Sequence, residues 1–486
     1  RAACARGLAA RSDTSVLGSP AVTALVTPAI AAASALRLVG AGCHLAGVTK
    51  GSPRARVLIG RRWRGLCRPL LAAESCASVI CFGPPGSFKT GGLAIPAILE
   101  WEGPVVVPAI KPDVIHATIA WRSRPGRQLW IYNPLAAGRL ASHTATPLAS
   151  CRSWAGAKEM GSWLAQAVDL TGQSRDDVNY WTTLGGKLLA VLMYAAAGSG
   201  RAITDVVRWV DTQEEHEVNE ALADLGCSAT QDAWDACKGR EQRTKSSVYG
   251  TAETLLDVFA DPRVQRSASG CEIDIDQLLS GDHTLYLYAP PAQQRRLRPL
   301  FIALITAVVR RAQEQAATQP GGLLDPRLLL CLDEAGNIAS IPDLPELATT
   351  GRGQGIALLS IFHDFGQVEA RYGRNAHTVV NGHRGKLILS AQADLATLRL
   401  AAELIGEEDT TEASVSLRSP FPLPDEPDGR TVAKHFRPLL PADQIRQLPQ
   451  RQGVLVYGNL PPTVVRLRAW WRTPGLRRRG STGGLR

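Results

Sequence analysis

The sequence predicts an α/β fold in which an inserted all-helical domain interrupts a mostly parallel sheet. Short apolar runs alternate with helical segments from Ala77 to Asn133, an order typical of a parallel sheet with crossover helices. Between Trp154 and Phe259 the apolar residues follow helical spacing throughout. Strand patterns then return in HTLYLYAP and continue to GVLVYGNL, with helices between them.

The composition is that of a globular protein, with 45% hydrophobic residues, 20% charged residues and a net charge of +10. The positive charge lies at the two ends, because residues 1–75 hold eleven Arg and Lys against two acids, and seven Arg with no acid follow Val465. Basic ends favour contact with nucleic acid or anionic lipid, and solvated tails are the alternative for the last ten residues. The ten cysteines form no C-x-x-C pair and no zinc-like cluster, which predicts reduced thiols in a cytosolic compartment.

One uncharged segment is a candidate membrane anchor. Residues Thr14 to Leu36 carry no charge over 23 positions, which is long enough to cross a bilayer. The segment is rich in Ala, Thr and Ser, however, and Pro20 and Pro28 interrupt it. The basic run KGSPRARVLIGRRWRG that follows would place the downstream chain in the cytoplasm. From the sequence, residues 14–36 are compatible with a membrane-spanning segment and with a soluble segment.

The stretch CFGPPGSFKTGG differs by one residue from a phosphate-binding loop, G-x-x-x-x-G-K-[ST]. Phe88 stands in place of the second glycine, while a strand pattern precedes the loop and a helical pattern follows it, as a P-loop requires. In such loops backbone N–H groups surround the phosphates, the lysine reaches the β and γ oxygens, and the Ser or Thr hydroxyl binds Mg²⁺. The candidate nucleotide-binding residues are Gly83, Pro84, Pro85, Gly86, Ser87, Phe88, Lys89 and Thr90.

A second motif, RLLLCLDEAGN, is an apolar strand that ends in Asp333 and Glu334. In P-loop enzymes this pattern supplies one carboxylate to the Mg²⁺ shell and a second that orients or activates the attacking water. The two motifs together predict ATP and Mg²⁺ as cofactors, with Thr90 and Asp333 as the metal-binding residues. A chance Gly/Pro-rich loop before Lys-Thr is the alternative.

The block from Leu328 to Gly373 resembles the Walker B region of the type IV secretion coupling proteins of the TraG/TraD kind. The resemblance extends through GGLAIPAILEWEGPVVVPAIKPDVI and LLPADQIRQLPQRQGVLVYGNLPP, and covers most of Ala77 to Arg472. It implies a RecA-like P-loop NTPase core with an all-alpha insertion. It also implies a homo-hexamer at the cytoplasmic face of the bacterial cell membrane. The implied partners are single-stranded DNA, relaxase and relaxosome proteins, and components of the type IV secretion channel.

Carried over by position, the resemblance implies that Asp333 is the Mg²⁺-associated acid and Glu334 the acid that activates water. Arg352 lies where the family places an arginine finger that reaches a neighbouring subunit's nucleotide, and a solvated loop arginine is the alternative. His363 stands where a glutamine that senses the γ-phosphate is expected. The candidate catalytic residues are therefore Glu334, Arg352 and His363.

Phe88 and His363 depart from the family pattern and put ATP hydrolysis in doubt. A glycine at position 88 would let the backbone approach the phosphates, and we expect the phenyl group to obstruct that approach. The preferred function is an ATP-driven coupling protein that delivers single-stranded DNA with its relaxase to a conjugation channel. The alternatives are a non-hydrolytic adaptor of the same fold that recruits substrate proteins, and another hexameric DNA translocase.

These patterns divide the chain into five predicted segments. Residues 1–75 are a basic N-terminal segment with the candidate anchor, and residues 473–486 are a basic disordered tail. The nucleotide-binding domain comprises residues 76–150 and 266–472, and the all-alpha domain, residues 151–265, is inserted between them.

Overall fold

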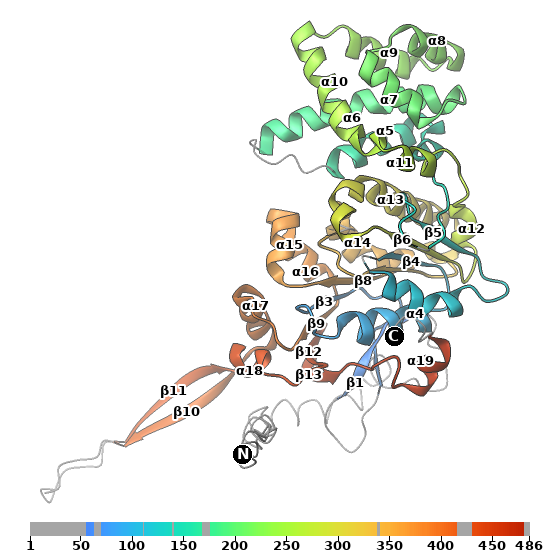
Figure 1. The fold of residues 1–486 in the computed structure, drawn as a ribbon. Coiled ribbons are helices and arrows are strands. Elements are labelled where there is room, and N and C mark those ends of the chain that lie inside the picture. The colour runs from blue at the N-terminus through green and yellow to red at the C-terminus, as the bar shows by residue number, and fades with distance from the viewer. Residues whose placement is uncertain are drawn as a thin grey trace, which may run out of the picture.

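The computed structural model describes residues 55–62, 70–109, 111–138, 140–167, 175–337, 341–415 and 430–480 (Figure 1). The candidate anchor at residues 14–36 lies outside the described residues. Within the described ranges, every helix is too short or too polar to span a membrane.

A single large sheet organises the nucleotide-binding domain, and its central strands are parallel. Its order is β2 (Leu70–Ala72), β1 (Leu58–Arg62), β13 (Leu460–Arg466), β12 (Gln452–Tyr457), β9 (Gly385–Leu389), β3 (Val79–Phe82), β8 (Ile356–Phe362), β7 (Leu328–Leu332), β4 (Val105–Ala109), β6 (Thr284–Tyr288) and β5 (Leu129–Tyr132). The strands from β9 to β5 pair in parallel, and β12, β13, β1 and β2 add antiparallel neighbours at one side. The mostly parallel sheet predicted from the sequence is confirmed.

Both faces of the sheet are buried, which explains why its strands read as continuous apolar runs. In β3, Val79 and Cys81 join the core on one face, and Ile80 and Phe82 join the core on the other. The first core includes side chains from α3 (Ile95–Glu100), α4 (Pro112–Arg122) and α19 (Pro474–Arg479). The opposite core takes side chains from α13 (Gln294–Thr318), α14 (Leu344–Thr350), α15 (Phe365–Tyr372), α16 (Ala376–Gly382), α17 (Leu395–Ile405) and α18 (Ala442–Arg446).

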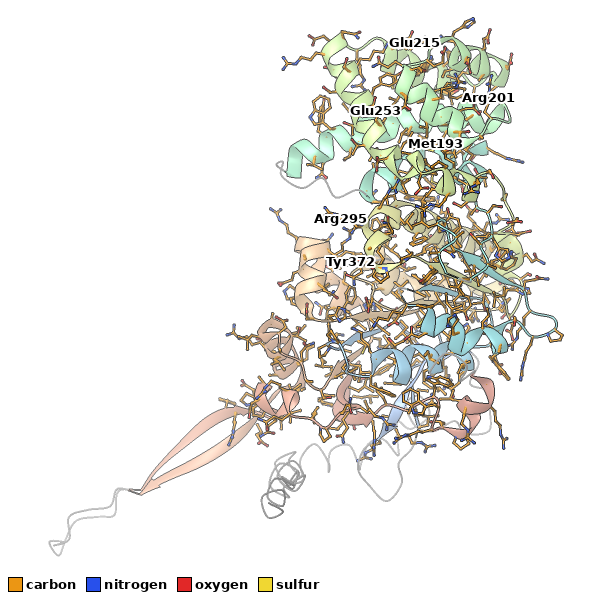
Figure 2. The ribbon with its side chains drawn as sticks, in the orientation of Figure 1. Met193, Arg201, Glu215, Glu253, Arg295 and Tyr372 are labelled. Atoms are coloured by element: carbon orange, nitrogen blue, oxygen red, sulfur yellow. The ribbon has the colours of Figure 1, made fainter. Side chains whose placement is uncertain are left out.

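The predicted all-helical insertion stands at one end of the sheet, above α13 in Figure 1. Its helices are α5 (Trp154–Ala167), α6 (Arg175–Gly198), α7 (Ile203–Thr212), α8 (His216–Leu225), α9 (Ser228–Lys238), α10 (Gln242–Leu256) and α11 (Pro262–Ser267). Helix α7 shows why they pack, because Ile203, Val206, Trp209 and Val210 form one buried stripe. Glu215 lies at the end of this domain farthest from the sheet, and Met193 lies closer to the sheet (Figure 2).

Two predicted boundaries were wrong. The sheet domain does not begin at residue 76, since β1 and β2 pair with each other and β1 pairs with β13. Part of the predicted disordered tail is helical, because α19 packs the buried side chain of Leu476 against the core and Arg479 Nη1 donates a hydrogen bond to the Leu99 carbonyl (3.1 Å). Packing against distant parts of the chain holds β1, β2 and α19 in place, although the sequence around them is rich in arginine.

In the structure, strands β10 (Glu407–Val415) and β11 (Arg430–Pro438) flank residues 416–429 and form an antiparallel two-stranded sheet. This hairpin projects from the body of the protein beside α17 and α18 (Figure 1). Its strands contribute no pairs to the main sheet.

His383, between α16 and β9, is a fully buried histidine whose two ring nitrogens both have partners. Nδ1 lies 2.6 Å from the Val379 carbonyl oxygen and donates to it, so Nε2 is left to accept from the Ser360 hydroxyl at 3.0 Å. Burial lowers the pKa of His383 to about 4, and the imidazole is therefore neutral in the folded protein.

We predict that His383 makes the protein less stable as the pH falls from 6.5 to 4. In this window the unfolded chain binds a proton at His383 and the folded chain does not, which favours unfolding. The gap between the two pKa values corresponds to at most about 3 kcal/mol. Urea unfolding at pH 7 and pH 5 measures the effect, and His383→Asn should show a shallower pH dependence than the parent. Equal pH dependence in the two proteins would contradict this assignment.

Candidate functional site

The two predicted motifs meet at the carboxyl ends of three neighbouring parallel strands. The P-loop follows β3, Asp333 and Glu334 follow β7, and His363 follows β8, which lies between the other two strands. The register places Phe82 opposite Phe362 and Leu332 opposite Ser360. The sheet therefore joins at one edge residues that lie more than 200 positions apart in sequence.

The loop from Gly83 to Ser87 has the close packing of a phosphate-binding loop. Gly83 N donates to the Phe362 carbonyl at 3.0 Å, and Ser87 N donates to the Pro84 carbonyl at 3.1 Å. A Cβ at Gly83 would lie 2.5 Å from Ser87 Oγ, and Gly86 has a φ of +80°, so both positions require glycine. Ser87 Oγ is buried and has no hydrogen-bond partner among the described residues, which leaves it available to a polar ligand.

Lys89 is buried and faces the ends of all three strands. Its Nζ donates to the Gly83 carbonyl at 3.1 Å and lies 2.5 Å from Nδ1 of His363. Burial lowers the pKa of Lys89, and the carboxylates of Glu334 and Asp333 act in the opposite direction. Burial and the nearby Lys89 lower the pKa of His363 as well, so a neutral imidazole accepts a hydrogen bond from the Lys89 ammonium group.

Thr90 and Asp333 are joined directly, as the predicted metal site requires. Thr90 Oγ1 donates to Asp333 Oδ2 at 2.9 Å, while the buried Asp333 Oδ1 has no hydrogen-bond partner among the described residues. Burial raises the pKa of Asp333 to about 6. The described residues contain no group of three or more His, Cys, Asp or Glu able to hold a metal. One hydroxyl and one carboxylate nevertheless fit Mg²⁺, which commonly binds through one or two carboxylates, water and substrate phosphates.

Glu334 lies next to this pair in a strained backbone conformation, with a φ of +65°. Its Oε2 accepts from Asn337 Nδ2 at 3.0 Å, and its Oε1 lies 4.0 Å from Nε2 of His363. A left-handed conformation at a residue other than glycine costs about 1–3 kcal/mol and is concentrated at functional sites. Lys89, His363 and Glu334 thus form one continuous line of polar groups across the three strand ends.

Two glutamines that the sequence analysis missed hold His363 in place. The backbone N of His363 donates to Gln367 Oε1 at 2.8 Å, and the His363 carbonyl accepts from Gln392 Nε2 at 2.8 Å. Asp364 caps the helix that carries Gln367. The position of Gln392, just beyond β9 at the same edge of the sheet, was the available sequence signal for this role.

The phenyl ring of Phe88 packs on the C-terminal segment, and the expectation that it obstructs the phosphate approach is not supported. The ring meets Trp471 edge to face at a centroid distance of 5.2 Å, and the Arg451 guanidinium lies 5.1 Å from its centroid. A Cβ at Gly92 would lie 2.5 Å from the ring, so the glycine makes room for it. Phe88 still has a φ of +77°, the conformation that favours glycine.

The structure does not bring Arg352 into this site. It lies in η6 (Gly351–Gln354), just before β8, and therefore at the amino edge of the sheet, opposite the P-loop. There Arg352 Nη1 pairs with Glu74 Oε2 at 2.6 Å. Its position excludes contact with a nucleotide bound by the same P-loop, so an arginine finger directed at another copy and a loop arginine paired with Glu74 both stay open.

The family model described as Type IV secretory system Conjugative DNA transfer matches residues 49–482. The chain belongs to this family. A conjugal transfer protein TraG of Escherichia coli is 24% identical, over 63% of this chain and 51% of that protein. The protein VirD4 of Rhizobium rhizogenes is 21% identical, over 81% of this chain and 58% of that protein. The chain thus spans about half the length of these relatives.

The solved structure of plasmid coupling protein TrwB in complex with ADP and Mg²⁺ has the same fold. Its TM-score is 0.62 at 17% sequence identity, and the match covers 86% of this chain and 95% of that chain. This likeness confirms the predicted α/β fold with its RecA-like P-loop core.

We predict that Phe88→Gly lowers the free energy of unfolding by about 1–2 kcal/mol. Loss of a partly buried ring costs a few kcal/mol, and relief of the positive φ returns about 1 kcal/mol. Phe88→Ala loses the ring and keeps the strained backbone, so it should be less stable than Phe88→Gly by about 1 kcal/mol. Urea unfolding of the three proteins measures both differences. A Phe88→Gly variant more stable than the parent would show that the packing on Trp471 contributes little.

Proposed function

We propose that this chain is an ATP-driven coupling protein, which delivers single-stranded DNA with its attached relaxase to a type IV secretion channel. The observation that carries this proposal is the direct hydrogen bond between the hydroxyl of Thr90 and Asp333, beside the buried Lys89. This arrangement unites the two halves of a nucleotide site across β3 and β7. TrwB, with the same fold, has been solved with ADP and Mg²⁺.

Each residue of the site has a proposed role. The loop from Gly83 to Thr90 binds the phosphates, with Lys89 leaving His363 to reach them. Thr90 and Asp333 hold Mg²⁺, which when bound neutralises the negative charge of the phosphates. Glu334 accepts a proton from the attacking water, and His363 donates a hydrogen bond toward the γ-phosphate in place of the family's glutamine.

The partners and location are proposed on the family relationship and on charge. We infer that the chain acts as a homo-hexamer at the cytoplasmic face of the cell membrane, with the relaxosome and the secretion channel as partners. The excess of Arg and Lys in residues 1–75 supports contact with anionic lipid or nucleic acid. The position of Arg352 at the edge opposite the P-loop supports an assembly in which one copy completes the site of the next.

A non-hydrolytic adaptor of the same fold remains the second candidate, and two observations favour it. Phe88 replaces the glycine of the loop, and the Lys89 ammonium group is engaged by His363 Nδ1 at 2.5 Å. An adaptor would bind nucleotide without turnover. Both candidates predict that Mg-ATP raises the melting temperature, because a ligand that binds the folded state stabilises it. The ATPase rate with and without single-stranded DNA separates them.

We predict that the parent hydrolyses ATP faster when single-stranded DNA is present, and that Glu334→Gln loses this activity by about 100-fold or more. The variant should still bind Mg-ATP, because the amide leaves Lys89, Thr90 and Asp333 unchanged. Lys89→Ala is the matched control and should lose nucleotide binding as well as turnover. Nucleotide binding without turnover in the parent would instead support the adaptor.

We predict that Arg352→Ala binds ATP with parental affinity and loses turnover by about 1,000-fold, as expected for an arginine that stabilises transition-state charge. Mixing it with inactive Lys89→Ala subunits should restore part of the activity. In mixed rings an intact P-loop then faces an intact Arg352. The absence of recovery at every ratio, with mixed oligomers shown by native mass spectrometry, would exclude a finger shared between copies.

A further inference from the structure

Three charged side chains form one cluster at the edge of the sheet opposite the P-loop. Glu74 lies just before β3, Arg352 just before β8, and Arg384 directly before β9. Because β9, β3 and β8 are parallel neighbours, their amino ends meet at this edge. The carboxyl ends of the same strands lead into the P-loop, His363 and Gln392. The two edges therefore carry complementary groups, a phosphate-binding loop on one and a pair of cations on the other.

Glu74 pairs with both arginines at once. Its Oε2 accepts from Arg352 Nη1 at 2.6 Å, its Oε1 accepts from Arg384 Nη2 at 3.2 Å, and Arg384 Nε lies 2.8 Å from Oε2 in an ion pair. The carboxylate side chain is 15% exposed, whereas the side chains of Arg352 and Arg384 are 50% and 40% exposed. The acid thus lies beneath the two guanidinium groups, which face outward.

The cluster is held by the body of the sheet. The backbone N of Glu74 donates to the hydroxyl of the buried Tyr457 at 2.8 Å, and the Arg384 guanidinium lies over the ring of Tyr457 at 5.7 Å from its centroid. A Cβ at Gly458 would lie 3.2 Å from Arg384 Cζ, so the guanidinium packs closely on that backbone. Four strand ends, of β3, β8, β9 and β12, thus fix the positions of the two cations.

The charges within the cluster do not balance. One carboxylate faces two guanidinium groups, and within the described part of the chain neither arginine forms an ion pair with another acid. The cluster keeps a net positive charge and N–H donors that Glu74 does not use. Outward-facing guanidinium groups of fixed geometry match the oxygens of a polyphosphate, which they bind through charge-assisted hydrogen bonds.

We propose that Arg384 acts with Arg352 as a second cation on the triphosphate bound by an adjacent copy of this chain, and that Glu74 is the positioning residue for both. This inference rests on the proposed function. The polyphosphate cannot be the chain's own, because the cluster and the P-loop lie at opposite edges of the same three strands. A head-to-tail contact between copies would bring the amino edge of one to the carboxyl edge of the next, and such contacts form a ring when the rotation between copies closes.

The first test measures steady-state ATP hydrolysis and nucleotide affinity of the 486-residue chain. Arg384→Ala should lower kcat by about tenfold or more, while the affinity for Mg-ATP and the oligomer mass stay within about twofold of the parent. Glu74→Gln, which keeps the backbone contact with Tyr457, should lower kcat in the same way without a change in affinity. The matched control is Arg311→Ala, whose side chain is 44% exposed and pairs with Asp276 at 2.6 Å, and it should keep parental turnover. Parental turnover in Arg384→Ala would overturn the proposal, and parental turnover in Glu74→Gln would overturn the positioning role.

The second test distinguishes a shared site from a merely structural contact. Arg384→Ala subunits mixed with Lys89→Ala subunits should recover activity, since the intact loop of one then faces the intact cations of the other. Arg384→Ala mixed with Arg352→Ala should not recover, because every interface then lacks one of the two cations. Recovery in this second mixture would show that the arginines act at different places and would overturn the proposal.

A further variant covers the case in which Arg384→Ala fails to assemble. If Arg384→Ala does not assemble, Arg384→Gln decides, because it keeps a long polar side chain and loses the positive charge. Assembly with lowered turnover supports the role, and full turnover overturns it.

A parent that neither binds nor hydrolyses ATP would contradict the proposed function itself. An active parent with an inactive Arg352→Ala and a fully active Arg384→Ala would reject only this inference.

Discussion

The parallel alignment of β3, β8 and β7 is the constraint on which the rest of the structure depends. Parallel strands present all their carboxyl ends at one edge, so a loop after the first and two acids after the third meet without a direct connection in sequence. The crossover segments that parallel strands require are long here, and one of them contains the whole helical domain. The residues of the candidate site are thus concentrated at the carboxyl edge, and the arginines that we propose to act on another copy lie at the amino edge.

The parts of the site that could be predicted are those whose residue types have a fixed place beside a strand. Lys89 and Thr90 follow a buried strand in a glycine loop, and Asp333 and Glu334 end another, so local pattern was sufficient. The partner of each group was not predictable, because the contact between Lys89 and His363 depends on β8 lying beside β3. Glu74 was missed for the same reason, since nothing local distinguishes it from a solvated acid.

The sequence predicted the fold where the apolar residues have a strong periodicity. It failed where a segment is ordered by contacts with residues far away in the sequence. The buried parallel strands and the helical insertion follow from apolar spacing. Strands β1 and β2 lie in an Arg-rich region whose charge resembles that of a tail, and their order comes from pairing with β13. Phe88 was misjudged because the sequence places it in the loop but does not show Trp471, which receives its ring. Gly91 and Gly92 were the local sign that the loop helix leaves space for a large neighbour.

The contacts of Arg468 and Trp470 with the segment after the P-loop can form only when most of the described chain has been synthesised. Trp470 N donates to the Gly91 carbonyl, and Arg468 Nη1 donates to Glu100 at 2.7 Å across a separation of 368 residues. The helix that follows the P-loop therefore lacks these partners until residues 468–470 have been synthesised. At about 5–20 residues per second this interval is roughly 20–75 s on the ribosome. For that time the helix after the phosphate-binding loop lacks contacts that it has in the folded protein, and the apolar surface around it is open to non-native association.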